Sequence, residues 1–401
     1  MTVRWVTAIP PCFDARGGGE IRQAHLLEAL AQRFDVQLLL AGRLEDRRVR
    51  ALAGSVREVP VEIAGDPRGR TRRRLRDIRW QVIERQPDEV ARQKRIRHAL
   101  ASELAGGPRA DIVCVEYIGL AQLLPARRAG LWALTLHNLT SEMARHSARI
   151  APGRRQRIML GFEERNSCRL ERWALGAYDL VVAVSNEDAA RLGGGVAVVP
   201  NGVDADRLRP TPLPAGPRVA FTGALHTLPN RDGIGWFCEH VWPSIRARIP
   251  DATLDVVGAA PAPEVLALGA LPGVRVHPDV PDVAPFLERA RVTLVPLRIG
   301  TGSRLKALEA MAAGRPVAGT SIGLGGLDVE PGREALVADD PAELARAVVQ
   351  CLTDDELAGR LAAHGRELVE RRYSWSTIGA DYAELLEARS AGARARVPSA
   401  R

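Results

Sequence analysis

Lysine is almost missing from this chain of 401 residues. Of its 56 basic residues only two are lysine, Lys94 and Lys306, and arginine supplies the rest. The two residue types are not interchangeable where a compact charge has to meet a phosphate group. Each lysine is therefore a candidate for a specific role.

Cysteine is scarce as well. The five cysteines are odd in number and scattered, and none has the spacing of a metal site or a C-x-x-C motif. This pattern argues against a disulfide framework and against a cysteine-held metal. It favours reduced structural thiols in a cytoplasm.

Apolar runs long enough to span a membrane are missing too, because the longest fall far below the ~20 residues that a transmembrane helix needs. No signal peptide is visible, since Met1 leads directly into a predicted strand at residues 3–9. The G-x-G-x-x-G and Walker A patterns are also absent. We expect a cytoplasmic protein, either soluble or peripheral on the inner face of the membrane, without a dinucleotide fingerprint.

The positive charge is concentrated in one stretch, the basic segment, which begins at Arg68 and ends at His98. It holds twelve basic and four acidic residues, an excess that equals the net charge of +8 of the whole chain. Leu75, Ile78 and Val82 fall on one helical face, which suits an anionic membrane surface or a phosphorylated lipid acceptor. A solvated helix with snorkelling arginines is the alternative. No motif with interleaved aromatic residues supports nucleic-acid binding.

Strand and helix patterns alternate from end to end, which predicts an α/β fold with doubly wound parallel sheets. The chain is longer than one ordinary core, and its hydrophobic content of 46% is enough for two. Helices are predicted at 20–33, 232–248 and 341–352. Strands are predicted at 3–9, 36–41, 56–63, 111–116, 132–136 and 180–184, and then at 219–223, 253–257, 274–277, 292–296, 316–319 and 335–338.

Proline and glycine divide the chain into parts. We expect an N-terminal domain at 1–185, a linker region at 186–217 and a C-terminal domain at 218–375. A helix at 376–390 and a disordered tail at 391–401 follow.

The most informative stretch is residues 292–317. A buried strand leads into a glycine turn at Gly300, Thr301 and Gly302, and a helix follows with Ser303 as its expected N-cap. Unpaired backbone N–H groups at such a helix start form an anion site. Arg304 and Lys306 add positive charge where a helix normally prefers acidic residues, which indicates a phosphate ligand.

Glu309 lies on the same predicted helix, at the edge of its apolar stripe. Burying this carboxylate is costly unless hydrogen-bond donors meet it, and sugar hydroxyls are such donors. The alternative is a side chain that reaches solvent or pairs with Lys306 or Arg315.

Three weaker motifs each follow a predicted strand. The triple glycine at 17–19 can cradle a phosphate but is more often a flexible loop. His137 and Asn138 end the strand at 132–136, and ligands in open α/β sheets bind at the carboxyl ends of strands. The loop that begins at Gly223 is a further phosphate platform, with His226 and Arg231 as charge and Asn230 as a helix cap.

With these segments in place, the chain resembles the group 1 glycosyltransferases with the GT-B fold. The resemblance covers nearly the whole chain, and its specific part is Lys306 with residues 308–312 (LEAMA) and 314–317 (GRPV). The glycine loop, His137 with Asn138, residues 184–186 and residues 200–204 support it.

The resemblance implies two Rossmann-like domains that face each other across a cleft. The N-terminal domain lies on the acceptor side, the C-terminal domain binds the nucleotide sugar, and the helix at 376–390 crosses back. It implies retaining transfer from a nucleoside-diphosphate sugar, a co-substrate, without a metal or other cofactor. It implies an acceptor in a polysaccharide, glycolipid or secondary-metabolite pathway, and a lipid-linked acceptor is one candidate.

The resemblance also implies roles for single residues, with His137, Lys306 and Glu309 as the catalytic ones. Glu309 holds the nucleotide ribose, Lys306 with Arg304 neutralises the diphosphate, and His137 contacts the donor sugar. Asp279 or Val280 meets the base, and the backbone from Gly300 to Ser303 binds diphosphate or sugar hydroxyls. The donor-binding residues are Gly18, Gly19, Gly223, Asp279, Val280, Gly300, Thr301, Gly302, Ser303, Arg304, Lys306 and Glu309.

Two departures from the family pattern leave alternatives open. Thr301 stands where the family often has the first of two glutamates, and Ala224 and Asn230 stand in the loop that often carries an arginine and a lysine. Because of these departures the sequence does not identify the sugar. Two other functions stay open as alternatives, a non-catalytic nucleotide-sugar-binding protein and a nucleotide-sugar epimerase.

Overall fold

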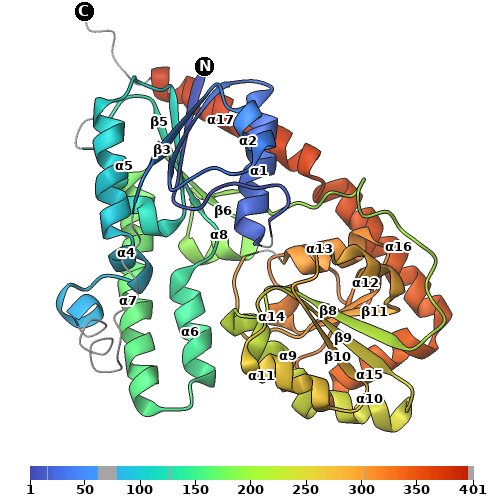
Figure 1. Cartoon of the computed structure of the whole chain (residues 1–401). Coiled ribbons are helices and arrows are strands. Elements are labelled where there is room, and N and C mark those ends of the chain that lie inside the picture. Colours follow the sequence, from blue (N-terminus) through green and yellow to red (C-terminus); the bar gives the residue numbers. More distant parts are fainter. Residues whose placement is uncertain (16, 62–78, 126–127, 303, 396–401) are drawn as a thin grey trace, which may run out of the picture. The chain divides into compact units, whose positions relative to one another are not determined.

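The computed structural model describes residues 1–15, 17–61, 79–125, 128–302 and 304–395. The chain divides into two compact units, each built around its own sheet (Figure 1). The first unit comprises Met1–Pro200 and Gly379–Arg401, and the second comprises Asn201–Ile378. Each unit is described by itself.

The first unit contains a parallel sheet in the order β3-β2-β1-β4-β5-β6-β7. Its strands are β1 (Thr2–Thr7), β2 (Asp35–Ala41), β3 (Ser55–Val59), β4 (Ile112–Glu116), β5 (Leu131–Leu136), β6 (Leu180–Ala183) and β7 (Ala197–Val198). Its helices are α1 (Gly18–Ala31), α2 (Arg47–Leu52), η1 (Arg79–Ile83), α4 (Asp88–Arg92), α5 (Lys94–Gly106), η2 (Ile118–Leu123), α6 (Thr140–Ile150), α7 (Arg154–Ala177) and α8 (Asn186–Leu192).

The second unit contains a parallel sheet in the order β10-β9-β8-β11-β12-β13. Its strands are β8 (Arg218–Thr222), β9 (Thr253–Gly258), β10 (Val274–Pro278), β11 (Val292–Val295), β12 (Val317–Gly319) and β13 (Leu336–Val337). Its helices are α9 (Leu228–His240), α10 (Trp242–Arg248), α11 (Pro263–Ala267), η3 (Leu268–Ala270), α12 (Ala284–Arg289), α13 (Leu305–Ala312), α14 (Ser321–Leu324), α15 (Pro341–Thr353) and α16 (Asp355–Arg372). A last helix, α17 (Trp375–Ala395), begins in this unit and belongs to the first unit from Gly379 onwards.

The fold class expected from the sequence is confirmed, because both sheets are parallel and helices alternate with strands. Every predicted strand overlaps an observed one, whereas the two-residue β7 was not predicted. The predicted helix at 232–248 is two helices, α9 and α10, that meet at Val241 just before Pro243. A proline in the first turn starts a new helix more easily than it continues an old one.

Two domain boundaries differ from the sequence analysis. The predicted linker at 186–217 contains α8 and β7, and β7 pairs with β6, so the first unit extends to Pro200. The predicted disordered tail begins at 391, but α17 continues to Ala395, and residues 396–401 lie outside the described part. Regular secondary structure therefore extends further into the predicted linker and into the predicted tail than the composition of these segments indicated.

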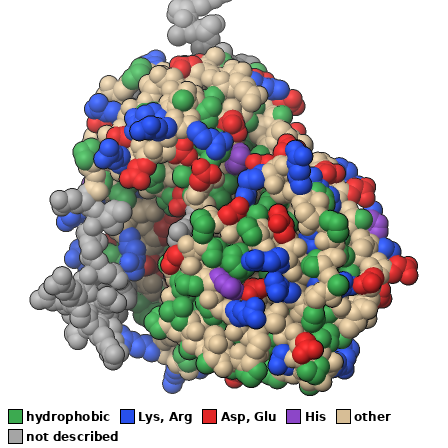
Figure 2. Space-filling view, turned by 45° about the vertical axis from the view of Figure 1, so that its right-hand side comes forward, with side chains coloured by type: hydrophobic (Ala, Val, Ile, Leu, Met, Phe, Trp, Pro, Cys, Tyr) green, Lys and Arg blue, Asp and Glu red, His purple; other side chains and the backbone are tan. Residues whose placement is uncertain are grey.

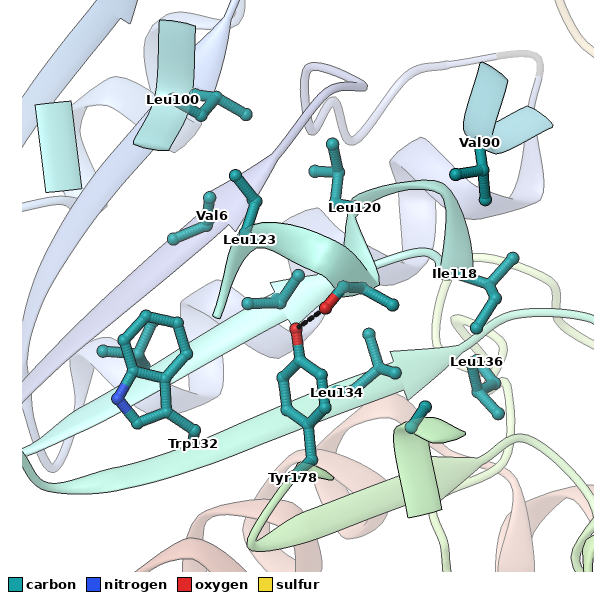
Figure 3. Packing of buried hydrophobic residues seen from close by; sticks show 14 of the residues in the cluster. Val6, Val90, Leu100, Ile118, Leu120, Leu123, Trp132, Leu134, Leu136 and Tyr178 are labelled. Atoms are coloured by element: carbon teal, nitrogen blue, oxygen red, sulfur yellow. Dashed lines mark hydrogen bonds between the residues drawn. The ribbon is translucent and has the colours of Figure 1, made fainter. Parts of the chain in front are cut away.

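The core of the first unit lies around its central strands. Val6, Val115 and Leu134, on β1, β4 and β5, are fully buried, and the hydroxyl of Tyr178 donates to the carbonyl of Ala121 at 2.8 Å within this core (Figure 3). Strands covered on both faces read as continuous apolar runs, which is why the sequence revealed them. The five cysteines are all free thiols.

Candidate functional site

The turn between β11 and α13 is held in an unusual backbone conformation. Gly300 has φ +150° and Gly302 has φ +73°, values that L side chains rarely adopt, and Thr301 between them is buried. The helix starts at Leu305 with Arg304 in the N-cap position, so the expected N-cap at Ser303 is not where the helix begins, and Ser303 itself lies outside the described residues. The glycines therefore shape the loop that the sequence singled out.

Arg304 braces this loop. Its guanidinium donates to the carbonyl of Thr301 and, at 3.2 Å, to the carbonyl of Ile322. A Cβ atom on Gly300 would lie 2.2 Å from Nη2 of Arg304, so the glycine is needed for this contact. The structure thus gives Arg304 a role in shaping the loop, and its contact with a diphosphate stays a prediction.

Lys306 is a partly buried lysine with a depressed pKa. Its Nζ donates to Oδ1 of Asn230 at 2.6 Å and lies 4.2 Å from the centre of the Phe221 ring. Burial and the charge of Arg304 lower the pKa of Lys306 to about 7, although Glu309 opposes this shift. Asn230 is not the cap of α9, since Thr227 occupies that position, and its Nδ2 donates to the carbonyl of Ala224 at 2.9 Å.

Glu309 lies one turn further along α13. Its carboxylate makes no hydrogen bond or ion pair with any residue that the structure describes, which contradicts the expected alternative of pairing with Lys306 or Arg315. Arg315 instead donates to backbone carbonyls, among them that of Ala313. Burial raises the pKa of Glu309 to about 7, while Arg207 and Lys306 oppose the shift. The side chain is partly exposed, so the part of the alternative in which it reaches solvent stands, and its contact with a ribose stays a prediction.

The loops after β8 and β9 lie close to each other, and the first of them lies close to Lys306. Gly223 has φ +152°, and a Cβ atom there would lie 2.7 Å from Nζ of Lys306. A Cβ atom on Gly258 would lie 1.7 Å from the carbonyl oxygen of Gly223, so the loops after β8 and β9 touch through backbone. The structure therefore brings Gly223 and Lys306 together, as a shared anion site requires.

Asp279 lies at the carboxyl end of β10 with φ +53°. Its Oδ1 accepts a hydrogen bond from the backbone N–H of Ala260 at 3.0 Å, and Ala260 also has a positive φ. Val280, next to it, is partly buried. Paired strain of this kind in adjacent loops accompanies ligand sites, but the contact with a base stays a prediction.

The two charged candidates that follow β8 are not shown to take part in this site. His226 is exposed, and Arg231 pairs with Glu264 at 3.3 Å.

In the first unit His137 follows β5, as expected, and meets two residues that the sequence analysis did not single out. Its Nε2 lies 2.6 Å from Oε2 of Glu116, the last residue of β4, and its ring stacks on Tyr117 with centres 3.9 Å apart. Burial lowers the pKa of His137, and Glu116 opposes that shift. The signal available in the sequence was a carboxylate at the end of an apolar strand.

The glycine loop lies against the same group. A Cβ atom on Gly19 would lie 2.0 Å from the Tyr117 hydroxyl, and Gly18 is the first residue of α1. Arg22, fully buried on α1, donates to the carbonyls of Val199 and Pro200 at the end of the unit. Gly19, Tyr117 and His137 are thus brought together, and the contact of Gly18 with the donor stays a prediction.

Neither a metal centre nor a membrane span is found in the described part of the chain. No group of three or more His, Cys, Asp and Glu side chains there could hold a metal ion. No helix there is both long and apolar enough to cross a bilayer.

Two sequence families match the chain. Residues 16–207 match the model of Glycosyltransferase Family 4, and residues 216–354 match that of Glycosyl transferases group 1. A phosphatidyl-myo-inositol mannosyltransferase of Mycobacterium leprae is 30% identical over 220 residues, which cover 52% of this chain and 58% of the relative. A GDP-mannose-dependent alpha-(1-6)-phosphatidylinositol monomannoside mannosyltransferase of Mycobacterium tuberculosis is 29% identical over 240 residues, covering 52% and 61%. The matched part thus spans less than two thirds of these relatives.

Solved structures resemble the chain over almost its whole length. Sucrose-phosphate synthase from Thermosynechococcus elongatus superposes with a TM-score of 0.75 at 20% identity, covering 98% of this chain and all (100%) of that one. Anabaena HepE in complex with UDP and glucose superposes with a TM-score of 0.65 at 14% identity, covering 97% and 100%. At such identities the likeness shows the fold alone, which is the GT-B fold of two Rossmann-like domains.

Proposed function

Because this chain belongs to the group 1 glycosyltransferases with the GT-B fold, we propose that it transfers a sugar from a nucleoside-diphosphate sugar to an acceptor with retention of configuration. The observation that carries the proposal is the carboxylate of Glu309. It is partly buried one turn beyond Lys306, at a glycine-shaped helix start, and no described residue donates to it. Such a group is costly unless a ligand supplies donors, and ribose hydroxyls do so.

The donor is held mainly by the second unit. Lys306 faces the diphosphate together with backbone N–H groups from Gly300 to Ser303, and Asp279 or Val280 meets the base. Negative charge grows on the diphosphate as it leaves, so a fixed cation and helix N–H groups stabilise the transition state. Because the pKa of Lys306 is lowered to about 7 in the protein alone, diphosphate binding near neutral pH is accompanied by proton uptake.

The sugar is recognised without the first of the two family glutamates. Thr301 occupies that position, is buried, and offers a hydroxyl instead of a carboxylate. His137 of the first unit contacts the donor sugar near the reacting carbon. No metal or other cofactor takes part in this scheme, and the nucleotide sugar is the only co-substrate.

The acceptor is proposed to be lipid-linked and the protein to work at the inner face of the membrane, in line with the phosphatidylinositol lipids that the names of the two mycobacterial relatives specify. Residues 68–78 of the basic segment lie outside the described part. In its remainder, Arg97 is buried and donates to backbone carbonyls, so this one arginine does not contribute to an exposed basic surface. Arg79 and Arg92 pair with Glu84 and Asp88, whereas Arg85, Lys94 and Arg95 are exposed.

The test is release of nucleoside diphosphate from a panel of nucleotide sugars. We expect slow release by the unmodified protein, with loss in Lys306→Ala and Glu309→Ala. Lys94→Ala, at the other lysine, which is exposed on α5, and Glu367→Ala, an exposed glutamate on α16, are the matched controls. Tight nucleotide-sugar binding without release would favour a binding protein, and an altered sugar still attached to its nucleotide would favour an epimerase. Either result defeats the transferase proposal.

A further inference from the structure

On the long helix α7 the basic and the acidic side chains lie on different faces. Its exposed face carries five arginines and two apolar side chains, Ile158, which is 51% exposed, and Trp173, which is 44% exposed. At 100° per residue, these seven positions lie within an arc of about 100°. We call this surface the α7 outer face. Its arginines are Arg154, Arg155, Arg165, Arg169 and Arg172.

The acidic side chains of α7 all point elsewhere. Glu163 is buried and accepts hydrogen bonds from Gln81 and from the backbone N–H of Asp88, both close to 3 Å. Glu171 is buried and accepts from the backbone and hydroxyl of Ser141 at the start of α6. Glu164 pairs with Arg145 of α6 at 2.9 Å. The helix therefore uses its three glutamates inside the unit and leaves only positive charge outside.

The arginines of the α7 outer face form no ion pair with any residue in the described part of the chain. On the face of the molecule shown in Figure 2, by contrast, basic and acidic side chains lie interspersed. A solvated helix usually gains stability from oppositely charged pairs three or four residues apart. Arg165 and Arg169 are a like-charge pair at that spacing, which destabilises the helix unless an external anion lies between them.

Two neighbouring segments extend this surface. Figure 1 shows α6 and α7 side by side, with their connection at the end away from the sheet. No acidic residue occurs from 143 to 162, and Arg149 and Arg157 near the connection are also exposed. The short helix η1 packs on α7, since Asn166 donates to the carbonyl of Gln81, and it presents Ile83 at 72% exposure.

We propose that the α7 outer face binds an anionic phospholipid surface. The arginines lie at the depth of the lipid phosphates, while Ile158 and Trp173 enter the interface, the region that tryptophan favours. The helix has 24 residues and a length of about 36 Å, so it can lie flat across several headgroups. An exposed isoleucine favours a lipid ligand, because single-stranded nucleic acids bind mainly by stacking their bases on aromatic side chains. The proposal concerns attachment and does not depend on the transferase activity.

The experiment is cosedimentation of the full chain with vesicles of phosphatidylcholine and phosphatidylglycerol in equal parts, and with vesicles of phosphatidylcholine alone. We expect binding only to the anionic vesicles, weakened by salt. Replacing Arg165, Arg169 and Arg172 by Gln lowers the partition constant by between about 10-fold and 100-fold. The matched control replaces Arg248, Arg275 and Arg371, three exposed arginines of the second unit, by Gln. We expect its partition constant to stay within about twofold of that of the unmodified protein.

A second measurement separates insertion from simple charge attraction. Brominated lipids quench tryptophan fluorescence, and we expect Trp173→Phe to remove most of that quenching although six other tryptophans remain. Circular dichroism checks that each variant is folded. Equal loss of binding in both triple variants, undiminished binding in the α7 variant, or quenching unchanged in Trp173→Phe each overturns the proposal. Retention of single-stranded DNA in place of vesicles would identify a nucleic-acid surface and overturn it as well.

Discussion

Nε2 of His137 lies 2.6 Å from Oε2 of Glu116, whose side chain is completely buried at the end of β4. The other carboxylate oxygen, Oε1, has no hydrogen-bond partner among the described residues. Burial lowers the pKa of His137 and so favours the neutral ring, and because a carboxylate can only accept, its contact with Glu116 requires the tautomer that carries the proton on Nε2. Stacking on Tyr117 fixes the plane of the ring. Glu116 is thus a positioning residue for His137.

Glu116→Gln is expected to reduce kcat by about 10-fold to 100-fold with little change in the KM for the donor, because the His137 ring loses its fixed tautomer while the residues proposed to bind the nucleotide and diphosphate are unchanged. The measurement is initial-rate release of nucleoside diphosphate over a range of donor concentrations. Glu45→Gln, at an exposed glutamate of the same unit, is the control. A kcat equal to that of the control would show that Glu116 serves stability only.

The hydrogen bond from Lys306 to Asn230 predicts a pH effect. Lys306 carries its charge below a pKa of about 7 and loses it above, and Glu309 is ionised above about 7, so kcat/KM is expected to fall on both sides of neutrality. Asn230→Asp places a carboxylate beside the ammonium group and raises the pKa of Lys306 by about 1 to 2 units. The alkaline limb of the profile then moves upward while the acid limb stays. An unshifted alkaline limb contradicts the assignment of that limb to Lys306.

The fold could be predicted because strands of a parallel sheet are covered on both faces. Residues 292–295 are all apolar or β-branched and are followed by Pro296 and Gly300, so their strand was visible without any tertiary information. The strand β7 was not, because two residues, Ala197 and Val198, carry no periodic signal. Lys306 and Glu309 were found from a local pattern on one helix.

The partners of these residues could not be found in that way. Glu116 meets His137 only because β4 lies beside β5 in the sheet, so that two strand ends 21 residues apart come together. Asn230 meets Lys306 across 76 residues, because β8 lies beside β11. Such contacts depend on strand order, which hydrophobic patterns within single elements do not encode.

Glu309 is expected to cost stability in proportion to its ionisation. Its folded pKa of about 7 lies above the ordinary 4.5, so the folded state is favoured most below 4.5 and loses that advantage as pH rises through 7. Glu309→Gln removes this loss and is expected to stabilise the protein at pH 8 by about 1 to 2 kcal/mol, a value discounted for partial exposure, or roughly 2 to 6 °C in Tm. At pH 5 the difference shrinks. Glu367→Gln is the control, and a Tm gain that is independent of pH would contradict the explanation.

Gly258 is expected to tolerate no side chain, although it touches neither Lys306 nor Glu309. It has φ +155°, and a Cβ atom there would lie 1.7 Å from the carbonyl oxygen of Gly223, a backbone atom that cannot rotate away. Gly258→Ala therefore displaces the loop that carries Gly223 and, through it, the setting of Lys306. We expect a loss of roughly 2 to 4 kcal/mol in the free energy of unfolding and a raised KM for the donor. Gly269→Ala is the matched control, since its nearest neighbour would be 3.7 Å away. If urea unfolding gives the two variants equal stability, the loops after β8 and β9 are not in backbone contact and the shape of the anion site needs another cause.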